Sequence, residues 1–276
     1  MVLNGFRAGE DLTPWRTLLA EVEHDELRLP EPVLDLAAYR EAARRVPART
    51  YCFVNSHSEP LVDGWLAKLL AALARPGVGL AGATGSWASA RSLMAHVLRL
   101  PSPYRGVLPD PRATIAAFGE IEAQRTGAPP VAVAQRGALA TAVARARTLV
   151  EAPAKMLPYA PFPAAHIRTN AFAISAPVLE RVHMRALREK ADAHLLESGR
   201  RSITRQVQRS GLRAVLVDRD GIAHDEDDWP RSRTFWQGAQ EGLLVRDNQT
   251  RCYEEADARR RRLLAGFAWG RQADPA

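Results

Sequence analysis

Short apolar runs that alternate with helical segments constrain the fold of this chain more than any other feature. Three runs, at residues 50–54, 78–83 and 212–217, are almost continuously apolar, which is typical of strands buried on both faces. Helical spacing of apolar residues lies between them, at 35–45 and 64–75. This β–α–β order predicts an α/β fold with a mainly parallel sheet and flanking helices, in which ligands bind at the carboxyl ends of the strands.

Weaker signals extend this core. Shorter strands are expected at residues 2–6, 24–29 and 166–174, and further helices at 12–22, 177–187 and 191–210. Because these segments extend from residues 2–6 to residues 191–210, they place almost the whole chain in one α/β unit. We therefore expect a single domain over residues 1–276.

The segment from about 88 to 163 interrupts the alternation. Alanine-rich helical stretches at 90–100, 114–125 and 131–150 are joined there by proline-rich loops, which predicts an inserted helical arm without a core of its own. Residues 224–276 are rich in Trp and Arg and are expected to wrap around the core.

Composition excludes several classes of protein. The chain is 46% hydrophobic and 25% charged, an ordinary globular composition. Its two cysteines are too few for a disulfide framework. The longest apolar stretch is bounded by Lys68 and Arg75 and is far shorter than the roughly 20 residues of a bilayer span. With no signal peptide recognisable at the start, we expect a cytoplasmic protein.

The charge balance is basic, with 38 Lys and Arg against 31 Asp and Glu. Most of these charges are scattered, which makes nucleic acid an unfavoured partner. The one dense run is at residues 259–262, followed by Leu263 and Leu264. This pattern predicts the solvated face of an amphipathic C-terminal helix, and an anionic lipid surface is the alternative.

Polar residues follow the predicted strand at 50–54 in the order Asn55-Ser56-His57-Ser58, before Pro60 and Gly64-Trp65-Leu66. Together with the glycines at 77, 79 and 82, and with Glu197, Arg205 and Gly211 before the strand at 212–217, this order resembles the family 2-like glycosyltransferases of the GT-A fold. The resemblance extends from about residue 2 to 217. The family's Asp-x-Asp motif is replaced here by Asn55-Ser56-His57.

The resemblance implies a GT-A-like fold and transfer of a sugar, with inversion, from a nucleotide-diphospho-sugar donor to a glycan or glycolipid acceptor. It also implies work in polysaccharide biosynthesis, with peripheral contact at the inner face of the membrane. Candidate contacts to the donor are Asn4, Arg7, Asp35, Asn55, Arg168, Asn170 and Arg201. For Asp35 a helix N-cap is the alternative role, and for Arg168 and Asn170 it is structural hydrogen bonding.

A departing diphosphate needs a divalent cation or fixed positive charge. His57 is the candidate ligand for Mn²⁺ or Mg²⁺, but an amide and an imidazole lack the charge of two carboxylates. The alternative is that Asn55 caps the strand end and His57 binds no metal. Arg168, Arg200, Arg201 and Arg205 are then candidates to supply the missing charge.

An inverting transfer also needs a carboxylate that accepts the proton of the acceptor hydroxyl. The resemblance places this base at Glu197, with Asp192 in reserve, and the alternative for both is a helix-surface acid. Two other functions remain open. One is a GT-A-like nucleotide- or sugar-binding protein that has lost catalysis, and the other is an arginine-rich nucleic-acid binder.

Overall fold

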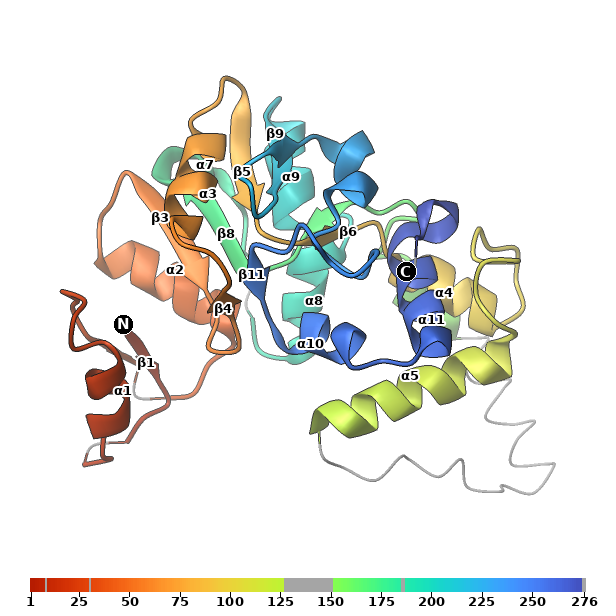
Figure 1. The fold of residues 1–276 in the computed structure, drawn as a ribbon, viewed down its shortest axis with the longest axis horizontal. Helices are drawn as coiled ribbons and strands as arrows, with labels where there is room; N and C mark the ends of the chain where they lie inside the picture. The colour runs from red at the N-terminus through yellow and green to blue at the C-terminus, as the bar shows by residue number, and fades with distance from the viewer. Residues whose placement is uncertain (8, 30, 127–150, 185–186, 275–276) are drawn as a thin grey trace.

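A mixed five-stranded sheet forms the centre of the molecule (Figure 1). The computed structural model describes residues 1–7, 9–29, 31–126, 151–184 and 187–274. The strand order is β10-β9-β5-β8-β3. The bounds are β3 (Thr50–Val54), β5 (Val78–Gly82), β8 (Ala171–Ser175), β9 (Arg213–Val217) and β10 (Ala223–His224).

Strand direction is where this sheet differs from the expectation. β5 and β9 are parallel, whereas β3–β8, β5–β8 and β9–β10 are antiparallel. The α/β class is therefore confirmed, but the expected mainly parallel sheet is not, because β8 enters between β3 and β5 in the opposite direction. Residues 166–174 also form two strands, β7 (His166–Ile167) and β8, with a turn between them.

Helices cover both faces of the sheet. One core cluster joins the sheet to α2 (Asp35–Arg45), α8 (Lys190–Ser198) and α9 (Ile203–Arg209), and the other joins it to α3 (Trp65–Leu73). Alternation along β8 shows the division, because Phe172 and Ile174 belong to the first cluster and Ala171 and Ala173 to the second. The short helix α7 (Ala176–Arg181) follows β8 directly.

The N-terminal segment forms a small unit in which two strands pair with each other. β1 (Val2–Asn4) pairs in parallel with β2 (Leu27–Leu29), and α1 (Thr13–Leu18) lies between them in the chain. Among the described residues, neither strand pairs with the five-stranded sheet. Figure 1 shows the unit at one side of the molecule, below β3 and α2. The strands expected at 2–6 and 24–29 therefore exist but do not extend the main sheet.

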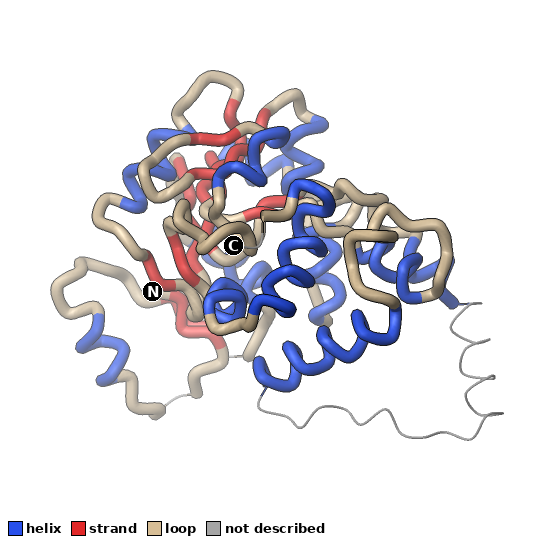
Figure 2. The backbone as a smooth tube through the Cα atoms, turned by 45° about the vertical axis from the view of Figure 1, so that its right-hand side comes forward, coloured by secondary structure: helices blue, strands red, loops and turns tan. Residues whose placement is uncertain are grey.

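The inserted segment packs against the C-terminal helices. α4 (Ala90–Val97) and α5 (Pro111–Thr126) are described, and the helix expected at 131–150 lies outside the described residues. Phe118 of α5 meets Phe267 of α11 (Ala258–Trp269) edge to face at 5.1 Å. The Tyr104 hydroxyl donates to the Phe267 carbonyl at 2.9 Å. The rotated view shows these helices gathered on one side of the strands (Figure 2).

The remaining elements are short. β4 (Glu59–Pro60) pairs with β11 (Val245–Arg246), and β6 (Gly85–Ser86) pairs with β7, both antiparallel. Two 3₁₀ helices, Glu226–Ser232 and Gly270–Gln272, and the helix α10 (Asn248–Glu254) complete the C-terminal wrap. No helix among the described residues has the length and apolar character needed to cross a bilayer. Both cysteines are free.

The arginine run at 259–262 begins α11 and is only partly solvated. Arg260 pairs with Glu120 at 2.9 Å, and Arg261 donates to the carbonyl of Glu254 at 2.6 Å. Arg259 and Arg262 are exposed. The expected helix is present, but its apolar residues do not form one face, because residues 263–266 are all buried and the arginines precede them.

Three glycines lie in or directly before β5. Gly77, Gly79 and Gly82 have the spacing G-x-G-x-x-G, but Gly79 and Gly82 lie inside the strand and not in a turn that opens a helix, as a dinucleotide-binding loop requires. A Cβ atom at Gly79 would lie 2.8 Å from the side chains of Leu212 and Val207. One at Gly82 would collide with Ile167. Gly79 and Gly82 therefore serve packing.

Candidate functional site

Four polar segments meet at one edge of the sheet. Asn55 follows β3, Thr84 follows β5, and Asp218 follows β9. Thr169 and Asn170 precede β8, and because β8 runs antiparallel to β3 and β5, its start lies at the ends of those strands. The register places Val54 opposite Ala171 and Gly82 opposite Phe172. Strand-end residues therefore converge, as expected, although the sheet is mixed.

Asn55 shapes the turn that follows β3. Its backbone N–H donates to the carbonyl of Asn170 at 2.9 Å. Its side-chain Oδ1 accepts from the backbone N–H of His57 at 3.1 Å and from the hydroxyl of Ser58 at 2.9 Å. This is an Asx turn, so Asn55 caps the strand end, which is the structural alternative considered for it.

The residues at the Asp-x-Asp position do not fit a cation site as they are arranged. The amide oxygen of Asn55 already accepts two hydrogen bonds, and His57 is exposed. Among the described residues, no group of three His, Cys, Asp or Glu side chains is placed to hold a metal ion. We therefore derive no step through a metal at His57.

Asn170 is a buried amide with only half of its hydrogen-bonding capacity used. It is 3% exposed, and its Oδ1 accepts from the Thr84 hydroxyl at 2.6 Å. Its Nδ2 is buried and has no hydrogen-bond partner among the described residues. An unpaired buried donor costs about 1–3 kcal/mol, and such groups are uncommon in folded proteins. Asn170, which was expected to contact the sugar donor, therefore has a buried N–H group with no described partner at this edge of the sheet.

Arg168 is buried and forms an ion pair within the protein. Its Nη2 donates to Asp247 at 2.6 Å, its Nη1 donates to Thr84 at 3.3 Å, and its guanidinium lies 4.2 Å from the centre of the Phe235 ring. Asp247 in turn caps α10 by accepting from the N–H groups of Gln249 and Thr250. Burial acts to raise the pKa of Asp247, but Arg168 outweighs it and the pKa is lowered. Arg168 thus ties the start of β8 to α10, which is the structural role considered for it.

Glu197, on α8, reaches the same edge through Thr169. Its Oε2 accepts from the backbone N–H of Thr169 at 2.8 Å and from the Thr169 hydroxyl at 2.6 Å. Its Oε1 accepts no hydrogen bond from any residue that the structure describes. Burial acts to raise the pKa of Glu197, but Arg168, His166 and the Thr169 hydrogen bonds together lower it. At neutral pH the site therefore holds an ionised carboxylate with one free oxygen.

His166 and Tyr39 complete the surroundings of this carboxylate. The His166 ring is buried, with Nδ1 2.8 Å from the carbonyl of Ala164, and burial lowers its pKa despite the attraction of Glu197. The buried hydroxyl of Tyr39 has no hydrogen-bond partner in the part of the chain that the structure describes. Burial, with the charges of Asp35, Cys52 and Glu197, raises its pKa far above the ordinary range. Sequence reasoning missed both residues, since neither lies in a motif.

The N-terminal candidates have other roles. The Asn4 side chain donates to the Val33 carbonyl at 2.7 Å and accepts from the Val33 N–H at 2.9 Å, which fastens β1 to the start of α2. Arg7 is exposed in the β1–β2 unit. Asp35 is exposed and is not the N-cap of α2, because that position belongs to Leu34. None of these three contacts Glu197 or the turn of Asn55 through a hydrogen bond within the described structure.

Three other candidates on or after α8, Asp192, Arg201 and Arg205, have roles separate from that of Glu197. Asp192 forms a capping box at the start of α8 by accepting from the N–H groups of Arg188 at 2.9 Å and Glu189 at 3.0 Å. These hydrogen bonds lower the pKa of Asp192. The structure thus favours the helix-surface role for Asp192. Arg201 lines a cavity elsewhere on α8, and Arg205 pairs with Glu226 at 3.6 Å.

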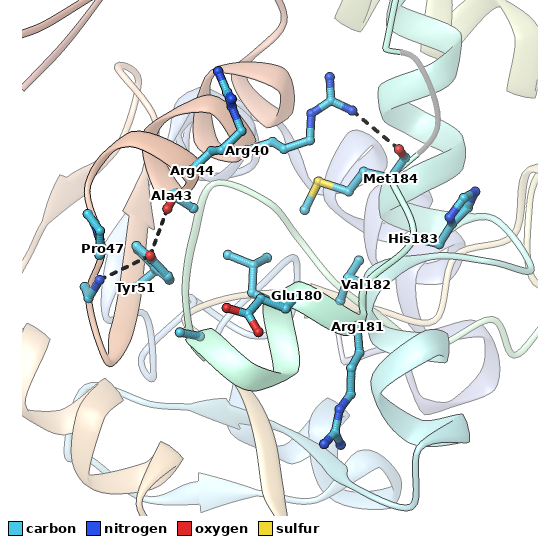
Figure 3. Close-up of a pocket in the computed structure, with 13 residues that line it drawn as sticks. Arg40, Ala43, Arg44, Pro47, Tyr51, Glu180, Arg181, Val182, His183 and Met184 are labelled. Atoms are coloured by element: carbon cyan, nitrogen blue, oxygen red, sulfur yellow. Dashed lines mark hydrogen bonds between the residues drawn. The ribbon is translucent and has the colours of Figure 1, made fainter.

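Three cavities lie away from this polar cluster. One, of about 690 Å³, opens at the opposite ends of β3 and β8, between α2 and α7 (Figure 3). Tyr51 borders it, with its hydroxyl donating to the carbonyl of Ala43 at 2.9 Å. A second, of about 510 Å³, borders α8, and a third, of about 370 Å³, lies between Trp87 and Trp269. Neither Glu197 nor Asn55 lines any of the three.

Comparison of the chain with protein-family models, with curated proteins and with solved structures found no match.

Proposed function

We propose that the chain transfers a sugar, with inversion, from a nucleotide-diphospho-sugar donor to a hydroxyl of a glycan or glycolipid acceptor, and that Glu197 is the general base. The observation that supports this most is the ionised Glu197 carboxylate at the shared strand edge, with Oε2 held by Thr169 and Oε1 free. A base needs such an oxygen within hydrogen-bonding reach of the acceptor proton.

The chemistry follows from that geometry. The acceptor hydroxyl attacks the anomeric carbon from the face opposite the diphosphate, and its proton passes to Oε1 of Glu197. The bond from the anomeric carbon to the diphosphate oxygen breaks, and the nucleoside diphosphate leaves with that electron pair. Two hydrogen bonds from Thr169 fix the carboxylate, so little orientation is lost as the proton moves.

The donor is placed over the turn of residues 55–58 in this proposal. That turn lies beside Asn170 at the same edge as Glu197, and the exposed His57 ring borders it. Positive charge for the diphosphate does not come from an unpaired Arg168, since Asp247 already neutralises that guanidinium.

This last point favours a second candidate function, a GT-A-like protein that binds a nucleotide or sugar without turning it over. Asn55 and His57 stand where the family has carboxylates, and the nearest buried arginine is paired. A leaving diphosphate without compensating charge departs slowly. Binding without turnover would then be the whole activity.

A binding and turnover screen separates these functions. We expect UDP-, GDP- or dTDP-sugars, tested with and without Mn²⁺, to raise the Tm of the full-length protein and to release nucleoside diphosphate when an acceptor is present. Glu197→Gln should keep the Tm shift and lose release. Glu180→Gln is the matched control, because Glu180 lies at the opposite end of β8.

Three outcomes are decisive. No Tm shift with any donor would contradict both functions. A shift without release in the wild type, with any acceptor, would favour the binding protein. Equal loss of binding and release in Glu197→Gln would contradict a role confined to proton transfer.

A further inference from the structure

One cavity has a different character from the polar cluster around Glu197. It has a volume of about 510 Å³ and borders α8. At about 100° per residue, Asp192, Leu195 and Leu196 share one face of this helix and Glu197 lies on another. The cavity and the proposed base therefore lie on separate sides of α8.

Three arginines line this cavity. Arg200 is held in place, because its Nε donates to the carbonyl of Leu157 at 3.0 Å. The guanidinium groups of Arg201 and Arg209 are exposed and make no hydrogen bond or ion pair with any described residue. Two cations are thus left free to bind an anion from solution.

Acidic side chains do not cancel this charge. Asp192 is the one acid among the described residues that line the cavity. Both of its hydrogen bonds come from backbone N–H groups of the capping box, on Arg188 and Glu189. With three arginines against one carboxylate, the cavity keeps an excess of positive charge.

Apart from His183, the rest of the lining is aliphatic. Leu187, Leu195, Leu196 and Pro158 form it, and Leu196 is only 6% exposed. Among the described lining residues, none is Phe, Tyr or Trp, the side chains on which a nucleobase or sugar ring stacks. The wall therefore suits an aliphatic group better than an aromatic or carbohydrate ring.

The neighbouring cavity of about 690 Å³ is lined by three arginines, Arg40, Arg44 and Arg181, and by the carboxylate of Glu180. Arg40 donates to the carbonyl of Met184 at 3.4 Å, and Arg44 pairs with Glu41 at 3.0 Å. Figure 3 shows His183, which borders both cavities, with its ring turned away from Glu180. Arg181 is exposed and has no hydrogen bond or ion pair with a described residue, so this cavity has one such cation, whereas the cavity beside α8 has two.

We propose that the cavity beside α8 binds an aliphatic phosphate ester. Arg201 and Arg209 hold the phosphate, because guanidinium forks match phosphate oxygens in bidentate pairs. The leucine wall takes the aliphatic group, whose burial adds affinity that inorganic phosphate cannot gain. A free ester in solution and the headgroup region of a lipid share this chemistry. The site is independent of the proposed glycosyl transfer.

Calorimetry on the full-length protein tests the proposal with octyl phosphate, inorganic phosphate and octanol as probes. Octyl phosphate should bind at least about tenfold more tightly than either of the others, as expected when a charge and an apolar group both contribute. The double substitution Arg201→Ala with Arg209→Ala should weaken octyl phosphate at least about tenfold. Arg259→Ala with Arg262→Ala removes the same charge from exposed positions of α11 and should leave binding unchanged.

The apolar wall and the source of the ester have their own measurements. Leu195→Ala should reduce affinity for octyl phosphate and leave inorganic phosphate unaffected. Co-sedimentation with phosphatidic acid vesicles, lost in the Arg201/Arg209 double variant, would assign the site to a lipid. Octyl phosphate binding without co-sedimentation would assign it to a free ester. Equal affinity for octyl and inorganic phosphate, or wild-type affinity in the folded double variant, would overturn the proposal.

Discussion

A few residues decide the chemistry of the polar edge, and their partners explain why. Glu197 is ionised because Arg168, His166 and Thr169 outweigh the effect of burial on its pKa. Arg168 is itself neutralised by Asp247. The side chains form a connected buried network in which one oxygen, Oε1 of Glu197, accepts no described hydrogen bond. That oxygen is the basis for assigning proton transfer to this residue.

The pKa of Glu197 makes a prediction about stability and pH. A carboxylate whose pKa is lower in the folded than in the unfolded chain contributes stability that is complete above the unfolded value of about 4.3 and is lost as pH falls through the folded value. The difference in unfolding free energy between wild type and Glu197→Gln should be constant from about pH 6 to 8 and should shrink below about pH 4. Urea unfolding across that range measures it, and a difference that grows on acidification would contradict the assigned direction.

Asp247→Asn tests the buried ion pair. The amide still accepts from Gln249 and Thr250, so the cap on α10 remains while the charge facing Arg168 is lost. Leaving a buried cation without its partner costs about 3–5 kcal/mol. Asp225→Asn breaks the exposed pair with Arg213, whose side chains are 56% and 48% exposed, and should cost less than about 1 kcal/mol. Similar losses in the two variants would contradict the importance of burial.

How far the site was predictable is also a matter of single residues. Asn55 and Asn170 were expected at this edge because they follow or precede apolar strands, and Glu197 because the resemblance places the base there. The structure brings all three to this edge. The pairing of Glu197 with Thr169 was not expected, since the β7–β8 turn creates it between residues 28 apart. The donor contacts expected from Asn4 and Arg7 depended on a main sheet that included β1, and the one expected from Arg201 depended on its positive charge. All three residues lie elsewhere.

At the scale of elements, strands that pack closely leave no room for a side chain, and glycine occupies such a position. β7 crosses close to β5, and Ile167 occupies the space where a side chain at Gly82 would lie. Helix α2 and strand β3 have the bounds that their apolar spacing predicts, 35–45 and 50–54. The helix expected at 191–210 divides instead into α8 and α9, because Gly199 ends the first and the side chain of Ser202 caps the second.

Gly82→Ala should therefore destabilise the fold by about 1–3 kcal/mol through overpacking. Ile167→Ala alone should also destabilise it by leaving a cavity. The double variant should lose less than the sum of the two, because the new methyl group fills part of that cavity. Chemical unfolding of all three variants gives the coupling energy.

Gly119→Ala is the matched control for this cycle. Gly119 lies in α5, and a Cβ atom there would meet nothing within 4 Å. Its replacement should be neutral or should stabilise by up to about 1 kcal/mol, since alanine favours helix. Strict additivity of Gly82→Ala and Ile167→Ala would contradict direct contact between these positions.

For the whole molecule, the direction of β8 determines the arrangement. Apolar runs identify β3, β5, β8 and β9 in the sequence, but they do not determine the direction of each strand in the sheet. The direction of β8 depends on how the inserted segment returns the chain to the sheet. An antiparallel β8 between β3 and β5 still brings polar residues to one edge. The α/β class was thus predictable from periodicity, whereas the mixed topology and the separate β1–β2 pair were not.

Hydrogen exchange should reflect this arrangement. Amides of β5, β8 and β9 lie in the interior of the five-stranded sheet and should exchange most slowly. Amides of β1 and β2, which pair only with each other among the described strands, should exchange faster than these. Exchange is followed by mass spectrometry. Equal protection of the five-stranded sheet and the β1–β2 pair would contradict a separate N-terminal unit.

The central claim is that Glu197 takes a proton during glycosyl transfer, and the initial rate of nucleoside diphosphate release tests it most directly. The rate is measured for wild type, Glu197→Gln and Glu180→Gln with the donor that raises Tm most and a hydroxyl acceptor. The account predicts that Glu197→Gln loses at least about a hundredfold in rate at unchanged donor affinity, as removal of a general base does, and that Glu180→Gln keeps the wild-type rate. Release by Glu197→Gln at the wild-type rate would contradict it.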